Sequence, residues 1–171
     1  MLKSLQNFIA NPKPSRQEAL GVLRANFALM FLAQVLVAIL LAVLLRLLSK
    51  PQHGSVLVSQ ILVLFTLLQL PLGVSLPLFA SRHGGKGAAL SATLLMSVLL
   101  STSAWFAAFA FLIGSQNSYL MIMLLLLIIY YNTGFFLCGH FANVALKEPP
   151  EKANGSDETE QLAQNSTDIP S

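Results

Sequence analysis

Residues 56–80 read VLVSQILVLFTLLQLPLGVSLPLFA, an apolar stretch that is long enough to cross a bilayer as a helix. Its second half carries Gln69, Pro71, Gly73 and Pro77, although lipid favours plain aliphatic side chains. Small and polar residues in a membrane helix favour contact with other helices. The stretch therefore predicts a membrane span that packs against protein along one face.

Three further apolar runs surround this stretch, at about residues 27–48, 88–113 and 119–146. Hydrophobic residues make up 55% of the 171-residue chain and charged residues only 10%, far below the share of about 25% in soluble proteins. The charged residues lie in the loops and at the ends of the runs. We therefore predict an all-α integral membrane protein, with a four-helix transmembrane bundle formed by residues 26–146.

Two polar segments flank the predicted bundle. Residues 1–25 form the first, a cytoplasmic juxtamembrane segment, and the amphipathic pattern of residues 1–10 fits both an interfacial helix and a frayed terminus. Ser15 and Glu18 have the spacing of a capping box, which predicts the start of a helix that continues into the membrane. Residues 147–171 are acidic and lack an apolar period, which predicts a disordered cytoplasmic tail.

Basic residues are distributed unevenly between the two ends of the predicted bundle. With four spans, both termini and the loop at residues 81–87 share one side, which carries eight Lys and Arg residues: Lys3, Lys13, Arg16, Arg24, Arg82, Lys86, Lys147 and Lys152. The other side carries two, Arg46 and Lys50. Because Lys and Arg accumulate in cytoplasmic loops, we expect both termini in the cytoplasm of a bacterial-type inner membrane. The basic pI of about 9.3 reflects this topology and does not indicate nucleic-acid binding.

Groups that carry catalysis or ion coupling are scarce in the predicted spans. Residues 27–146 hold no Asp or Glu, whereas proton relays and ion-coupled transporters place ionisable groups inside the membrane. A single cysteine, Cys138, excludes an intramolecular disulfide and a cysteine zinc site. His83 and His140 have no carboxylate nearby to complete a metal site. We therefore expect no enzymatic activity, no catalytic residues, no cofactor and no metal.

Polar residues in the predicted spans lie at depths that allow them to meet. The sequence predicts an interhelical polar cluster formed by Gln34, Gln69, Asn132, Thr66, Ser97 and Ser101. Hydrogen bonds within such a cluster would fix the register of the helices. The alternative is a polar lining for a small permeant or a bound lipid.

Small residues recur at helical spacing in the second and third runs. They predict a packing face that comprises Ser59, Gly73, Pro77, Ala104 and Ala108. Pro71 and Pro77 each remove a backbone hydrogen bond, which predicts a helix kink or a short unwound segment between Gln69 and Pro77. This pattern favours residues 56–80 as the central helix of the bundle.

Close-packing faces without catalytic or ion-coupling groups favour a small multi-pass inner-membrane protein that acts as an accessory, assembly or regulatory subunit. It would act through helix–helix contacts along the small-residue faces of the second and third spans. The expected partners are the lipid bilayer and other membrane proteins or further copies of the chain, and no nucleic acid is expected.

Other functions remain open. One is an oligomeric channel, a holin-like pore or a small-solute transporter, lined by Gln69 and Asn132. Another is a membrane enzyme that acts on lipid through residues 82–87 and His140. The four-span layout is similar to that of ATP synthase accessory subunit I and of colicin immunity proteins, but the chain shares no motif with either.

Overall fold

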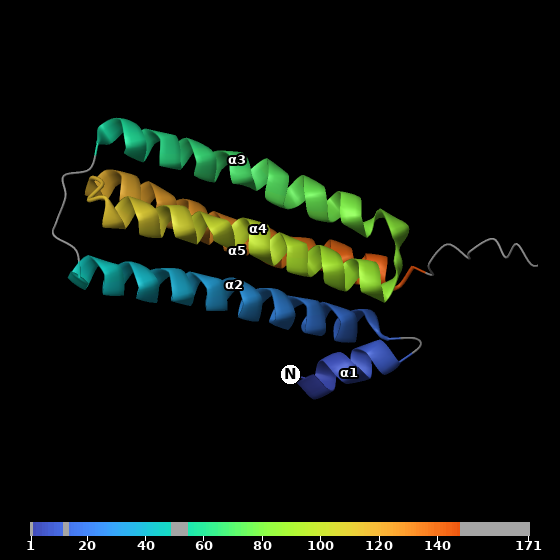
Figure 1. Ribbon diagram of the computed structural model, residues 1–171. Helices are drawn as coiled ribbons and strands as arrows, with labels where there is room; N and C mark the ends of the chain where they lie inside the picture. The colour runs from blue at the N-terminus through green and yellow to red at the C-terminus, as the bar shows by residue number, and fades with distance from the viewer. Residues whose placement is uncertain (1, 12–13, 49–54, 148–171) are drawn as a thin grey trace, which may run out of the picture.

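The computed structural model describes residues 2–11, 14–48 and 55–147. These residues form five α-helices and one short 3-10 helix, and they contain no strand (Figure 1). In chain order the elements are α1 (Leu2–Ala10), α2 (Arg16–Leu48), α3 (Val56–Ala80), η1 (Ser81–His83), α4 (Gly85–Leu112) and α5 (Asn117–Ala145). Helices α2 to α5 are long and apolar enough to cross a membrane, which confirms the predicted all-α transmembrane bundle.

The central helix of the bundle is α4. It contacts α2, α3 and α5, and α2 and α3 lie on opposite sides of the α4–α5 pair (Figure 1). Eleven of the 28 residues of α4 are buried, against five of the 25 residues of α3. The prediction that residues 56–80 form the central helix is therefore wrong. The small alanines and serines of α4 fit between three neighbours, whereas most leucines of α3 face outward.

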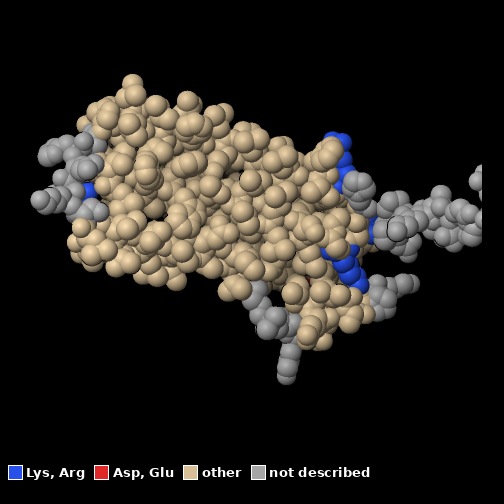
Figure 2. Space-filling model, viewed as in Figure 1, with Lys and Arg blue, Asp and Glu red and all other residues tan. Residues whose placement is uncertain are grey.

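Apolar side chains cover the outside of the bundle between its two ends. Leu40 on α2, Leu64 on α3 and Leu125 on α5 each expose more than half of their surface. Lys and Arg side chains visible in Figure 2 lie at the ends of the molecule and not along its middle. This distribution suits a bundle that is surrounded by lipid and bounded by two polar interfaces.

Helix α2 extends well beyond the hydrocarbon region. Its 33 residues give a length of about 50 Å, against about 30 Å for the hydrocarbon core of a bilayer. The charged residues of its first half, Arg16, Glu18 and Arg24, mark the end that extends out of the membrane. The helix begins at the predicted capping box, where the Glu18 backbone N–H donates to Ser15 Oγ at 3.2 Å.

Helix α1 folds back against the start of α2 (Figure 1). Phe8 anchors it, because its side chain is fully buried within the main hydrophobic cluster. Lys86 Nζ donates to the Asn11 carbonyl oxygen and lies 5.8 Å from the centre of the Phe8 ring. Asn11 Nδ2 donates to Glu18 Oε2 at 3.4 Å. Residues 2–10 thus form a docked helix and not a frayed segment.

Helix α3 is a continuous α-helix through both prolines. The unwound segment that the sequence allowed between Gln69 and Pro77 is therefore absent. After α3, η1 leads into a turn at Gly84 and Gly85, whose positive φ angles of 69° and 84° suit glycine. Apart from Lys147, the predicted acidic tail lies outside the described residues. Lys13 and Lys50 also lie outside them.

Candidate functional site

The six residues of the predicted polar cluster are divided among several contacts. Gln34 on α2 and Ser101 on α4 meet, because Ser101 Oγ is hydrogen-bonded to Gln34 Oε1. The Ser97 hydroxyl instead donates to the carbonyl of Leu94 on its own helix, at 2.8 Å. Only the Gln34–Ser101 pair joins two members of the predicted set by a direct side-chain hydrogen bond within the described part of the chain.

Thr66 takes part in a link between α3 and α5 through Tyr130, a residue outside the predicted cluster. The Thr66 hydroxyl donates to the Leu62 carbonyl at 2.8 Å, and the Thr66 carbonyl accepts a hydrogen bond from the Tyr130 hydroxyl. Both side chains are fully buried. A tyrosine in mid-span is the sequence signal for this contact, because its hydroxyl needs a partner away from water.

Gln69 has an unsatisfied acceptor inside the bundle. Its Oε1 atom is buried and has no hydrogen-bond partner among the described residues. A buried acceptor without a partner costs about 1 to 3 kcal/mol of stability. The sequence placed Gln69 in a mutually bonded cluster, but the structure gives this oxygen no such bond.

Asn132 lies on the outside of the bundle. Its side chain is exposed on α5, and Nδ2 donates to the Ile128 carbonyl of the same helix at 2.8 Å. The residue follows Asn117 by 15 positions and precedes Ala145 by 13, so it lies about 20 Å from either end of α5. The structure therefore does not bring Asn132 to the five inward-facing members of the predicted cluster.

The predicted packing face is used within the bundle itself. Four of its members are buried and Ala108 is half-buried; the buried ones are Ser59, Gly73, Pro77 and Ala104. Ser59 Oγ lies 2.7 Å from Ser115 Oγ across the interior. At Gly73 an added Cβ would lie 2.5 Å from Leu100 Cδ2 of α4. Ser59 and Gly73 thus lie at contacts of α3 within the bundle, whereas Ala104 and Ala108 of α4 lie beside α2 and α5.

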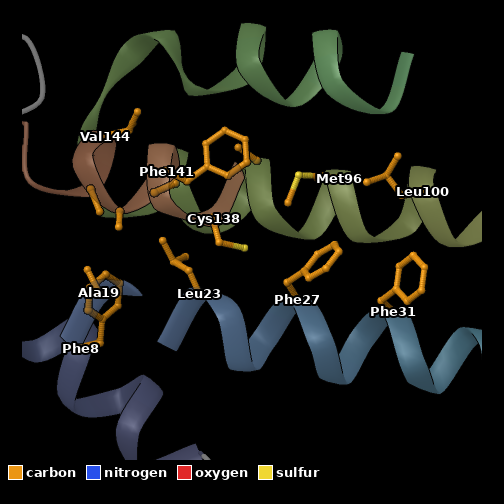
Figure 3. Packing of buried hydrophobic residues seen from close by; sticks show 14 of the residues in the cluster. Phe8, Ala19, Leu23, Phe27, Phe31, Met96, Leu100, Cys138, Phe141 and Val144 are labelled. Carbon is orange, nitrogen blue, oxygen red and sulfur yellow. The ribbon is translucent and has the colours of Figure 1, made fainter. Parts of the chain in front are cut away.

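A second close approach, at Gly134 of α5, was not found from the sequence. A Cβ added at Gly134 would lie 2.2 Å from Cζ of Phe27 on α2. The Phe27 ring is in turn packed against Phe31 and Tyr131, with centroids 5.6 and 5.9 Å away. Figure 3 shows Phe27 and Phe31 pointing from α2 toward the helix that carries Met96. A glycine within an aromatic-rich span is the only sequence signal of this contact.

Arg24 lies beside the same aromatic cluster. Its guanidinium carbon is 4.3 Å from the centre of the Phe135 ring, a cation–π contact. The Arg24 Nε atom is buried and has no hydrogen-bond partner among the described residues. Nearer the same end of the bundle, Arg16 Nε donates to Asn143 Oδ1 at 2.9 Å and so joins the start of α2 to the last turns of α5.

Residues with reactive side chains are dispersed. Among the described residues, no group of three or more His, Cys, Asp or Glu is placed to hold a metal ion. Cys138 is buried in the core, and His140 is exposed beside Phe141, with ring centroids 5.8 Å apart. The His83 side chain lies outside the described residues.

Comparison of the chain with protein-family models, with curated proteins and with solved structures found no match.

Proposed function

We propose that the protein is a non-enzymatic accessory, assembly or regulatory subunit of a bacterial-type inner membrane, and that it acts through helix–helix contacts. The observation that carries this proposal is the outward-facing amide of Asn132. One N–H of this amide donates to the Ile128 carbonyl of its own helix. Lipid chains offer no hydrogen-bond partner to the rest of the amide, so its exposure in mid-membrane is costly unless another helix covers it. Asn132 is therefore better explained by a partner helix than by lipid.

The residues around Asn132 form a stripe that suits such a helix. Met121, Leu125, Ile128, Asn132 and Phe136 follow one another at steps of 4, 3, 4 and 4 residues, and we call them the Asn132 face. All five are exposed, and Phe136 exposes 74% of its surface. An apolar seam that contains a single asparagine is a pattern by which helices pair in a fixed register. The Asn132 face replaces the small-residue faces of α3 and α4 as the proposed contact.

Affinity purification in mild detergent, followed by mass spectrometry, tests the proposal. Wild-type protein should retain a membrane protein or a second copy of itself. Asn132→Leu should weaken that association about 5- to 30-fold, because an interhelical hydrogen bond contributes about 1 to 2 kcal/mol. Thr102→Val is the matched control, because Thr102 lies on α4 and its hydroxyl donates only to Val98 of its own helix. A wild-type protein without any partner, or equal retention in Asn132→Leu, would remove the basis of the proposal.

One observation favours a channel or small-solute transporter as the second candidate. Gln69 Oε1 is a buried acceptor without a partner among the described residues, and a polar permeant would supply one. Flux through liposomes that contain the purified protein decides between the two functions. The accessory role predicts no flux above that of empty liposomes. A flux that Gln69→Leu abolishes would instead support the channel.

A further inference from the structure

An apolar groove opens between α2, α4 and α5 in the half of the bundle that is remote from α1. Its volume is about 220 Å³, and its lining includes Val35, Ala42, Ala104, Ala108, Phe111 and Leu124. An apolar cavity of about 150 Å³ is enough to bind benzene. The groove lies beside a small buried cluster of Leu62, Ala110 and Met123, whereas the larger cluster fills the half of the bundle that contains Phe8.

The length of the groove suits a hydrocarbon chain of one leaflet. Along α2 it extends from Val35 to Val43, about 12 Å, which is less than the thickness of one leaflet, about 15 Å. The groove is open along one side, and three alanines, Ala42, Ala104 and Ala108, form part of its lining. An acyl chain of one leaflet runs along the bundle helices and is long enough to fill the groove from end to end.

Arg46, a cationic side chain, lies at the end of the groove, where the phosphate of such a lipid would lie. Arg46 follows Val43 by three residues on α2, about 4.5 Å further along the helix axis. Its guanidinium carbon is 5.7 Å from the ring centre of Phe111, a residue that lines the groove. Arg46 Nη1 donates to the Leu112 carbonyl at 3.1 Å, and among the described residues its other four N–H groups remain for further acceptors.

No carboxylate among the described residues can neutralise Arg46. In that part of the chain the only acidic residue is Glu18, near the opposite end of α2. The phosphate of a lipid is the anion that occurs at this depth of a membrane, and arginine binds phosphate through several N–H donors. We propose that the groove binds one glycerophospholipid from the leaflet at the Arg46 end, with an acyl chain along α2, α4 and α5 and the phosphate at Arg46. This site is independent of the Asn132 face.

Native mass spectrometry tests the acyl-chain part of the site. The full chain is reconstituted in vesicles of phosphatidylglycerol and phosphatidylcholine and then extracted in mild detergent. Wild-type protein should retain one phospholipid. Ala108→Leu fills the groove and should lower retention about tenfold or more. Ala33→Leu adds the same atoms to an exposed position of α2 outside the groove and should behave as wild type. Equal retention in Ala108→Leu and wild type would overturn the proposal.

The phosphate contact is tested by a pair of charge substitutions. Arg46→Gln should lower lipid retention several-fold. Arg82→Gln removes the same charge from the opposite end of the bundle, where Arg82 lies 4.8 Å from the Phe79 ring, and should leave retention unchanged. Excess soluble glycerol 3-phosphate should not displace the lipid, because it has no acyl chain. Displacement by this compound would show a simple anion site and would contradict the proposal.

A measurement on the wild-type chain avoids any effect of substitution on folding. Phosphatidylglycerol with a photoreactive acyl chain is crosslinked in vesicles, and the modified residues are mapped by mass spectrometry. The adducts should concentrate on residues 35–43, 104–111 and 120–127. Adducts spread evenly over the lipid-facing surface would show that the groove holds no particular lipid.

Discussion

Two glycines lie at close helix contacts, and the side chains that face them differ in how easily they could move to admit a methyl group. At Gly134 an added Cβ meets the ring of Phe27, and that ring is held by Phe31 and Tyr131. At Gly73 the added atom meets the flexible end of Leu100. A rigid aromatic ring cannot yield, whereas a leucine can change rotamer. The α2–α5 contact should therefore be more sensitive to a single methyl group than the α3–α4 contact.

We expect Gly134→Ala to lower the free energy of unfolding by about 1 to 3 kcal/mol, the usual cost of overpacking. Gly73→Ala should cost less than about 1.5 kcal/mol, within the range of well-tolerated changes of volume. Gly139→Ala is the control on α5, because nothing lies within 4 Å of its added Cβ. Unfolding in detergent, followed by circular dichroism, measures all three. Equal stability of Gly134→Ala and Gly139→Ala would contradict the close approach of Phe27.

The two glutamines of the membrane interior should respond in opposite directions. Gln69→Leu removes the unpartnered oxygen and should leave stability unchanged or raise it. Gln34→Leu removes a hydrogen bond, but Ser101 Oγ keeps a bond to the Val98 carbonyl at 3.1 Å, so the loss should be about 0.6 kcal/mol. Unfolding free energies of the two variants in the same detergent check this difference. Destabilisation by Gln69→Leu would indicate a bond that the structure does not contain.

At the scale of elements, α1 is held at the end of the bundle by few contacts. Phe8 is its one fully buried side chain whose burial the structure describes, and the adjoining Asn11 bonds to Lys86 and Glu18. Elements with few buried contacts open locally without global unfolding. The docking of α1 is therefore separable from the stability of the four spans.

Phe8→Ala should release α1 and leave α2 to α5 intact. Hydrogen exchange should accelerate for the backbone amides of residues 2–10 and remain as in wild type for the spans. Ile9→Ala is the matched control, because Ile9 is the next residue and exposes 58% of its surface. If Phe8→Ala left exchange in α1 unchanged, the burial of Phe8 would not be what holds the helix.

The sequence predicted the existence and type of the four long helices well, because runs of apolar residues alone define membrane spans. It did not predict which helix is central. The prolines and Gln69 favoured residues 56–80 as the central helix. A central helix, however, needs small side chains on several faces, and α4 has them. Within the site, Ser101 and Gln34 of the predicted cluster are hydrogen-bonded to each other. Asn132 is exposed instead, because residue spacing gives the face of a helix but not which helices lie around it.

At the scale of the whole molecule, the charges define two unlike ends. Arg16, Arg82, Lys86 and Lys147 lie at one end and Arg46 at the other. Under the orientation that the sequence predicts, the end with more basic residues faces the cytoplasm. Single cysteines in a Cys138→Ser background test this: Gly87→Cys should react with an impermeant thiol reagent only from the cytoplasmic side, and Ser55→Cys only from the other. The reverse labelling would contradict the predicted orientation.

The bundle is closed by its own small-residue contacts, and this leaves the outward amide of Asn132 as the feature that calls for a partner helix. A photoreactive amino acid placed at Phe136 in native membranes tests this claim most directly, with the same group at Leu40 of α2 as the control for general exposure to lipid. The proposed helix–helix contact predicts a protein adduct of defined mass at position 136, its loss in Asn132→Leu, and none at position 40. Adducts of equal yield at both positions, or an adduct at position 136 that persists in Asn132→Leu, would contradict it.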